Sequence, residues 1–236
     1  MRFSNHTIRI SDGPNFYILY KDIFVRRIYH FEALCNDPLI LDCGSNIRIS
    51  ILYFKSVYPK ARIIGFEPDP VVFAYLKENI AMNQLDNVKL LQAAVADQEG
   101  RLTFYTDSKY GSCLSQYLPA DVRCSLLARE EVHCIGLGDY LTEPVDFLKM
   151  NIEGAELSAL GGCADRLRMI REMVVEYHHL PGLPRALHKI LALLDEQGFE
   201  YLVNDFDSQT NVAVSAPFRL TPNTRYYLLI YARRMD

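Results

Sequence analysis

The sequence has no long apolar run, no block of like charges and no closely spaced pair of cysteines. A membrane-spanning helix needs about 20 apolar residues, whereas the apolar stretches of this chain have the length of buried strands and helix faces. The net charge is −4 and no basic cluster occurs, so we expect neither nucleic acid nor an acidic membrane surface as a partner. The sequence therefore predicts a globular protein without a membrane span.

The six cysteines do not have the spacing of a metal site. None belongs to a CxxC pair or stands at a zinc-binding distance from a histidine, so we predict reduced, partly buried thiols and no metal. The first residues, MRFSNHTIRISDGPN, are polar and lack the apolar segment of a secretion signal. Both features indicate a cytoplasmic protein.

Half of the 236 residues are hydrophobic, which is enough for one large domain with a buried core. The hydrophobic period predicts strands at 39–41, 62–66, 88–95, 101–105, 132–135, 145–150, 173–177, 199–203 and 226–231, and helices at 47–57, 70–83, around 157–160 and at 185–197. Strands that alternate with helices imply a parallel sheet with right-handed crossovers. The last two strands have no clear helix between them. The predicted fold class is α/β, a doubly wound, mostly parallel, seven-stranded Rossmann-like sheet with an antiparallel C-terminal edge.

Residues 1–38 are expected to form a small N-terminal extension, and residues 39–236 the main domain. In the extension, residues 7–10 and 16–20 alternate around an Asp-Gly-Pro turn, which favours a hairpin. Asp22 is a candidate cap for a short helix through Arg27 to His30.

Polar side chains follow four of the predicted strands, namely Asp42, Glu67, Asn151 with Glu153, and Glu176 with His178. In an open parallel sheet, ligands bind at the carboxyl ends of the strands. Asn151 and Glu153 are two residues apart, as are Glu176 and His178, so each pair points to one side if its strand continues. We therefore expect the functional site at this edge of the sheet.

The first turn contains Gly44, which would let the backbone approach a ligand closely. The free N–H groups of the helix that follows favour a carboxylate or phosphate. The further glycines of the dinucleotide fingerprint are missing, which counts against a nicotinamide-dependent enzyme. Glu67 can accept two hydrogen bonds from a ribose diol. The plainer alternatives are an ordinary turn glycine and a surface glutamate before a Pro-Asp-Pro turn.

The third and fourth strand ends offer candidates for proton transfer. His178 has an unperturbed pKa suited to a base near neutrality, although a hydrogen-bonded structural histidine is the alternative. Glu153 is the other candidate base, while Glu156 is interpreted as a charge favoured by the first turn of a helix.

Five segments together resemble the FkbM family of methyltransferases: LILDCGSNIRIS, IIGFEPDP, LLQAAVADQEGRLTFY, VDFLKMNIEGAELSAL and MVVEYHH. The resemblance covers about residues 39–231 and implies S-adenosylmethionine as cofactor and O-methylation of a sugar, a glycan or another small metabolite. It implies that the cofactor's methionine portion lies at Asp42 and the loop Gly44, Ser45 and Asn46, its ribose at Glu67, and its adenine at Pro68, Ala93 and Ala94. Asn151 would then lie near the sulfonium and Glu153 near the acceptor.

The chain departs from the family pattern at two positions. Arg48 stands where the pattern D-x-G-x-N-x-G has its second glycine, and its side chain could turn to solvent, pair with the cofactor's carboxylate or obstruct the pocket. Asn151 replaces a common aspartate, which makes a metal-dependent mechanism less attractive. The two departures support an alternative, a non-catalytic or weakly active binding module with the same fold.

The acceptor is expected to contact residues 106–130 and 204–224. Tyr110, Tyr117, Phe206 and Phe218 are candidates for stacking on a sugar or aromatic ring, with ordinary packing as the alternative. An apolar N-terminal segment is compatible with folding back on the domain or with a homo-oligomer.

Overall fold

The structure of the protein is a computed structural model, which describes residues 2–3, 6–10, 13–47, 49–106, 112–114, 128–179, 184–205, 221, 224 and 226–235. Outside these ranges lie Arg48, the four aromatic candidates for acceptor stacking, and most of the two expected substrate loops.

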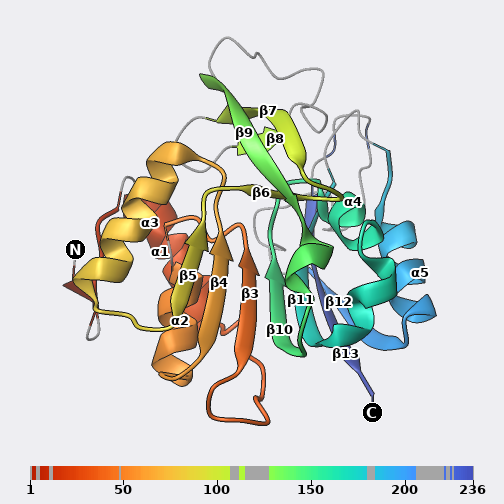
Figure 1. Cartoon of the computed structure of the whole chain (residues 1–236), viewed down its shortest axis with the longest axis horizontal. Helices are drawn as coiled ribbons and strands as arrows, with labels where there is room; N and C mark the ends of the chain where they lie inside the picture. Colours follow the sequence, from red (N-terminus) through yellow and green to blue (C-terminus); the bar gives the residue numbers. More distant parts are fainter. Residues whose placement is uncertain are drawn as a thin grey trace.

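The main sheet has seven strands in the order β12-β13-β11-β10-β3-β4-β5 (Figure 1). The strands are β3 (Leu39–Cys43), β4 (Arg62–Phe66), β5 (Val88–Leu91), β10 (Val145–Met150), β11 (Ile170–His179), β12 (Phe199–Asn204) and β13 (Tyr226–Arg234). The neighbours from β5 to β11 are parallel, whereas β13 is antiparallel to both β11 and β12. The predicted fold class, including the antiparallel C-terminal edge, is confirmed.

Helices cover both faces of this sheet. They are α1 (Gly13–Tyr20), α2 (Ile49–Val57) and α3 (Pro70–Met82) on one side, and α4 (Glu156–Gly161) and α5 (Leu187–Glu196) on the other (Figure 1). Successive strand residues point to opposite faces: Ile40 is buried in the cluster that contains Phe54 of α2, and Leu41 in the cluster that contains Leu160 of α4. The central strands β3 and β10 are therefore buried on both faces, as their nearly continuous apolar sequences require, whereas the edge strand β12 is mostly exposed.

A second sheet, which the sequence analysis did not predict, lies beyond the carboxyl ends of β3, β4 and β5 (Figure 1). It consists of β6 (Ala94–Ala96), β7 (Gly100–Thr106), β8 (Ser112–Leu114) and β9 (Ala128–Gly136), in the order β6-β9-β7-β8. The single strand expected at 88–95 is wrong, because β5 ends at Leu91 and β6 pairs with β9 instead. An apolar run does not show where a strand changes its pairing partner.

The N-terminal segment differs from the predicted hairpin. Residues 16–20 lie in α1, which continues into the π-helix η1 (Lys21–Val25), so the expected helix from Asp22 to His30 is also wrong in its bounds. Gly13-Pro14 opens this helix rather than forming a turn, since proline is tolerated in the first turn of a helix. The residues that do pair are β1 (Arg2–Phe3) and β2 (His6–Thr7).

The N-terminal segment also contributes to the main core. Phe16, Ile23, Tyr29 and Phe31 are buried in one cluster with the side chains of α2 and α3. The ring of Phe31 stacks on Phe147 of β10 with centroids 4.4 Å apart. The boundary at residue 38 stays a prediction, but the core is shared across it.

No helix among the described residues is long and apolar enough to cross a membrane.

Candidate active site

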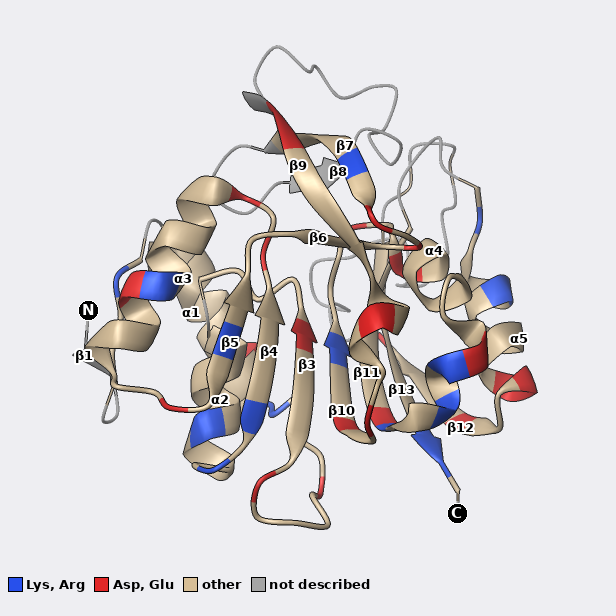
Figure 2. Cartoon of the chain, in the orientation of Figure 1, with Lys and Arg blue, Asp and Glu red and all other residues tan. Residues whose placement is uncertain are grey.

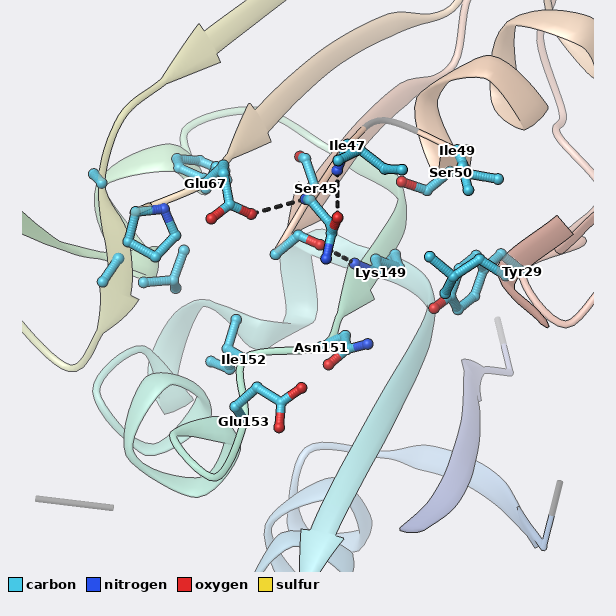
Figure 3. A pocket seen from close by; sticks show the side chains of 18 of the residues that line it. Tyr29, Ser45, Ile47, Ile49, Ser50, Glu67, Lys149, Asn151, Ile152 and Glu153 are labelled. Carbon is cyan, nitrogen blue, oxygen red and sulfur yellow. Dashed lines mark hydrogen bonds between the residues drawn. The ribbon is translucent and has the colours of Figure 1, made fainter. Parts of the chain in front are cut away.

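A pocket opens at the carboxyl ends of β3, β4 and β10 (Figure 3). Nine predicted site residues line it together: Gly44, Ser45, Asn46, Glu67, Pro68, Ala93, Ala94, Asn151 and Glu153. The N-terminal segment supplies three further lining residues, Leu19, Ile23 and Tyr29. Asp42 and His178 stand behind the walls and contact residues that line the pocket.

Behind the first turn, Asp42 forms a fully buried ion pair with Lys149, with 3.2 Å between Oδ1 and Nζ. The two residues are register partners on neighbouring strands, and Figure 2 shows the acidic end of β3 beside a basic position of β10. Ser50 donates a hydrogen bond to the other carboxylate oxygen at 2.6 Å. Lys149 also donates to the carbonyl oxygens of Gly44 at 2.6 Å and Cys43 at 3.2 Å, so one ammonium holds both the strand end and the loop.

Gly44 is required by a close approach between two segments. Its φ is +81°, and a Cβ atom there would lie 1.9 Å from the carbonyl oxygen of Asn151. The backbone N–H of Asn151 in turn donates to the Cys43 carbonyl oxygen at 3.0 Å. The turns after β3 and β10 are thus in direct contact, which only a residue without a side chain permits.

Glu67 ends β4 and joins two loops. One carboxylate oxygen accepts a hydrogen bond from the Asn46 N–H at 2.8 Å and the other from the Asp69 N–H at 3.0 Å. Asp69 is the N-cap of α3, accepting from Val71 and Val72, so the Pro-Asp-Pro segment starts that helix. Burial raises the pKa of Glu67 to about 7, against the opposing effect of the two backbone hydrogen bonds. Each oxygen keeps a second lone pair for a ligand in the pocket.

His178 lies between Glu153, in the turn after β10, and Glu156, at the start of α4. Nδ1 is 2.9 Å from Glu156 Oε1 and Nε2 is 3.6 Å from Glu153 Oε2. Burial alone would lower the pKa of His178, but the attraction of Glu153, Glu156 and Glu176 outweighs it and raises the pKa to about 10. The imidazole is therefore a cation at neutral pH. Glu156 is the first residue of α4, as expected, but it is buried and also accepts from the Gly154 N–H at 3.1 Å.

Glu153 is the more accessible carboxylate of this group. Its side chain is 37% exposed and lines the pocket, whereas that of Glu156 is 2% exposed. Its backbone φ of +55° is unusual for a residue with a side chain. Burial beside the other acids raises the pKa of Glu153, and His178 opposes that rise.

Asn151 and Tyr29 share the carboxylate of Glu176. Asn151 Nδ2 donates to Oε2 at 2.8 Å, and the Tyr29 hydroxyl donates to Oε1. Tyr29 was not predicted as a site residue, because nothing in its sequence neighbourhood marks it. Lys149 was not predicted either, although a lone lysine inside the apolar strand VDFLKM was an available signal.

Among the described residues, no three side chains of His, Cys, Asp and Glu gather as metal ligands would.

The overall architecture is that of Rossmann-like methyltransferases. A methyltransferase FkbM structure from Methylobacillus flagellatus KT superimposes with a TM-score of 0.51 over 85% of this chain and 45% of that chain, at 16% identity. A precorrin-6y C5,15-methyltransferase from Geobacter metallireducens covers 98% of this chain and 95% of its own, with a TM-score of 0.50 and 13% identity.

Sequence comparison identifies the family: residues 42–201 match the methyltransferase FkbM domain. Methyltransferase sdnD of Sordaria araneosa is 30% identical, with 77% of this chain and 81% of the relative covered. The 31-O-demethyl-FK506 methyltransferase FkbM of Streptomyces tacrolimicus is 30% identical, with 77% and 80% covered. The 2-O-methyltransferase NoeI of Sinorhizobium fredii is 29% identical, with 60% and 63% covered. The chain belongs to the FkbM methyltransferase family, and it is a methyltransferase.

We predict that Lys149→Met destabilises the protein by about 3 kcal/mol, because it leaves Asp42 as a buried charge without its cation. Asp42→Asn is expected to lower the free energy of unfolding by a similar amount. The double variant should lower it by clearly less than the sum of the two single losses. Urea unfolding followed by circular dichroism measures all three, with the exposed Lys60→Met as the control that changes little. Strictly additive losses would contradict the pairing.

Proposed function

We propose that this methyltransferase uses S-adenosylmethionine and methylates a hydroxyl group of a sugar, a glycan or another small metabolite. The observation that carries the proposal is Glu67, a buried carboxylate at the end of β4 that faces the same pocket as the Gly44 loop. A carboxylate there suits a ribose diol, which offers two hydroxyl donors. The relatives named 31-O-demethyl-FK506 methyltransferase and 2-O-methyltransferase support a hydroxyl acceptor.

The residues of the pocket fit this cofactor in shape and in charge. The side chains of Ala93 and Ala94 are small, which leaves room for a flat adenine beside Pro68. Asp42 is buried and its carboxylate is paired with Lys149, so it does not face the pocket. The loop of Gly44, Ser45 and Asn46 is therefore the part of the first turn that would border the methionine portion. The carboxylates of Glu67 and Glu153 line the pocket and favour a cationic ligand.

When bound, S-adenosylmethionine supplies an electrophilic methyl group on a positively charged sulfur. The protein's part in the reaction is to align an acceptor oxygen behind that methyl group and to remove the oxygen's proton. In such a transfer the new bond would join the acceptor oxygen to the methyl carbon, and the electron pair of the broken carbon–sulfur bond would stay on sulfur. The acceptor's proton passes to a base of the protein.

Of the two bases considered, we favour Glu153. His178 carries a proton at neutral pH, since its pKa is raised to about 10, so its ring nitrogens cannot accept another. Glu153 lines the pocket and is partly exposed, so an acceptor can reach its oxygens. His178 then acts through its cation, which holds Glu153 in place and favours the ionised carboxylate.

The cofactor proposal predicts saturable binding of S-adenosylmethionine by the wild-type protein in titration calorimetry. The affinity should rise as the pH is raised through about 7, because ionisation of Glu67 makes both of its oxygens acceptors. Glu67→Gln should bind about tenfold more weakly, with a flat profile across that range. Glu143→Gln, an exposed glutamate paired with Arg62, is the control that leaves binding unchanged. No heat at high cofactor concentration would instead favour the non-catalytic binding module.

The base assignment predicts that Glu153→Gln lowers turnover at least about 100-fold while cofactor affinity changes only a few-fold. Turnover is measured as S-adenosylhomocysteine formed with a panel of sugar and small-metabolite hydroxyl acceptors. His178→Gln, which keeps a hydrogen-bond donor but removes the charge, should lower turnover less than Glu153→Gln does. The reverse order of the two losses would assign the proton transfer to His178.

A further inference from the structure

Tyr29 belongs to the pocket but precedes the segment that matches the family model, which begins at residue 42. It follows the π-helix η1 and is 2% exposed, with its ring packed beside Phe54. The ammonium of Lys149 lies 5.7 Å from the ring centroid, so the ring also faces the central ion pair. Tyr29 therefore connects the N-terminal segment to the polar side chains at the strand ends.

The Tyr29 hydroxyl and the Asn151 amide approach the two oxygens of the same carboxylate. Glu176 is buried; its Oε1 accepts a hydrogen bond from the Tyr29 hydroxyl, and its Oε2 accepts one from Asn151 Nδ2. An ionised carboxylate only accepts hydrogen bonds, so the side of Asn151 that faces it must be the NH₂ group. The carbonyl oxygen of the amide must then point the other way. Figure 3 shows this arrangement, with the amide nitrogen of Asn151 on the Tyr29 side and its oxygen toward Glu153.

An amide is the group at residue 151 that complements Glu176. An ionised aspartate in its place would put two carboxylates side by side in a buried site, and one of them would have to hold a proton. The negative charge that faces Asn151 thus resides on Glu176, one strand away, and is held there by Tyr29.

We propose that Tyr29 is a positioning residue of the methyl-transfer site. By holding Glu176, it fixes the amide of Asn151 with Oδ1 turned into the pocket, where this uncharged oxygen would border the sulfonium of a bound cofactor. The N-terminal segment thereby completes a site whose other residues come from the strand ends. This inference rests on the proposed function, because it takes S-adenosylmethionine as the ligand.

The positioning role is tested by comparing Tyr29→Phe with Tyr58→Phe. Both variants remove a hydroxyl that anchors the N-terminal segment, since Tyr58 donates to the Phe31 carbonyl oxygen at 2.7 Å and accepts from the Ala33 N–H at 3.1 Å. Only Tyr29 reaches Glu176. Calorimetry measures the affinity of each variant for S-adenosylmethionine and for S-adenosylhomocysteine, which lacks the sulfonium charge.

We expect Tyr29→Phe to weaken S-adenosylmethionine binding roughly fivefold, while S-adenosylhomocysteine binding changes less than about twofold. Tyr58→Phe should leave the ratio of the two affinities unchanged. If Tyr29 had a purely structural role, Tyr29→Phe would lower the affinity for both ligands equally, and that result would overturn the inference. A wild-type protein that binds neither ligand would instead overturn the proposed function, and this inference with it.

The contact between Asn151 and Glu176 has an independent test that needs no ligand. Asn151→Asp should lose thermal stability as the pH rises from about 5 to 8, because a carboxyl whose pKa is raised in the folded state favours folding only while it is protonated. The double variant Asn151→Asp with Glu176→Gln exchanges the amide and the acid, so it should recover the stability and lose the added pH dependence. The other titratable groups that face the pair are the same in both variants, namely Tyr29, Tyr231, Lys149, Glu153 and His178.

If the single variant does not fold, recovery of folding in the double variant supports the contact. A single variant with the wild-type pH profile, or a double variant no better than the single one, would overturn it.

Discussion

The buried ion pair between Lys149 and Asp42 is the interaction on which the site depends. Two charges withdrawn from water are costly unless their geometry is good and their remaining hydrogen bonds are made. Here Ser50 donates to one oxygen of the carboxylate and the ammonium lies 3.2 Å from the other, while the ammonium itself donates to the carbonyl oxygens of Cys43 and Gly44. The pair therefore fixes the end of β3, the end of β10 and the loop between β3 and α2 at the same point.

The other acids at the strand ends are held in the same manner, each by donors from a different element. Glu67 accepts from backbone N–H groups of two loops, and Glu176 accepts from Tyr29 and Asn151. Polar groups fixed in this way need little rearrangement when charge develops during a reaction, which is the usual source of electrostatic catalysis. Glu153, partly exposed and next to the cationic His178, is the acid left most open to an acceptor.

The strand ends could be predicted from the sequence because their pattern is local. Asp42, Glu67 and Asn151 were predicted because each follows a short apolar run. Parallel topology brings the ends of such strands to one edge of the sheet. The second sheet could not be predicted, since the apolar residues from 88 to 95 carry no sign that pairing changes after Leu91. Tyr29 was equally hidden, because its partner Glu176 lies 147 residues further along the chain.

The central claim is that the pocket at the ends of β3, β4 and β10 holds S-adenosylmethionine and delivers its methyl group toward Glu153. A crystal structure of the complex with S-adenosylhomocysteine and a bound acceptor tests this most directly. The account predicts ribose hydroxyls within hydrogen-bonding distance of Glu67, sulfur beside Asn151 and the acceptor oxygen facing Glu153. A cofactor bound elsewhere, or one whose ribose makes no contact with Glu67, would contradict it.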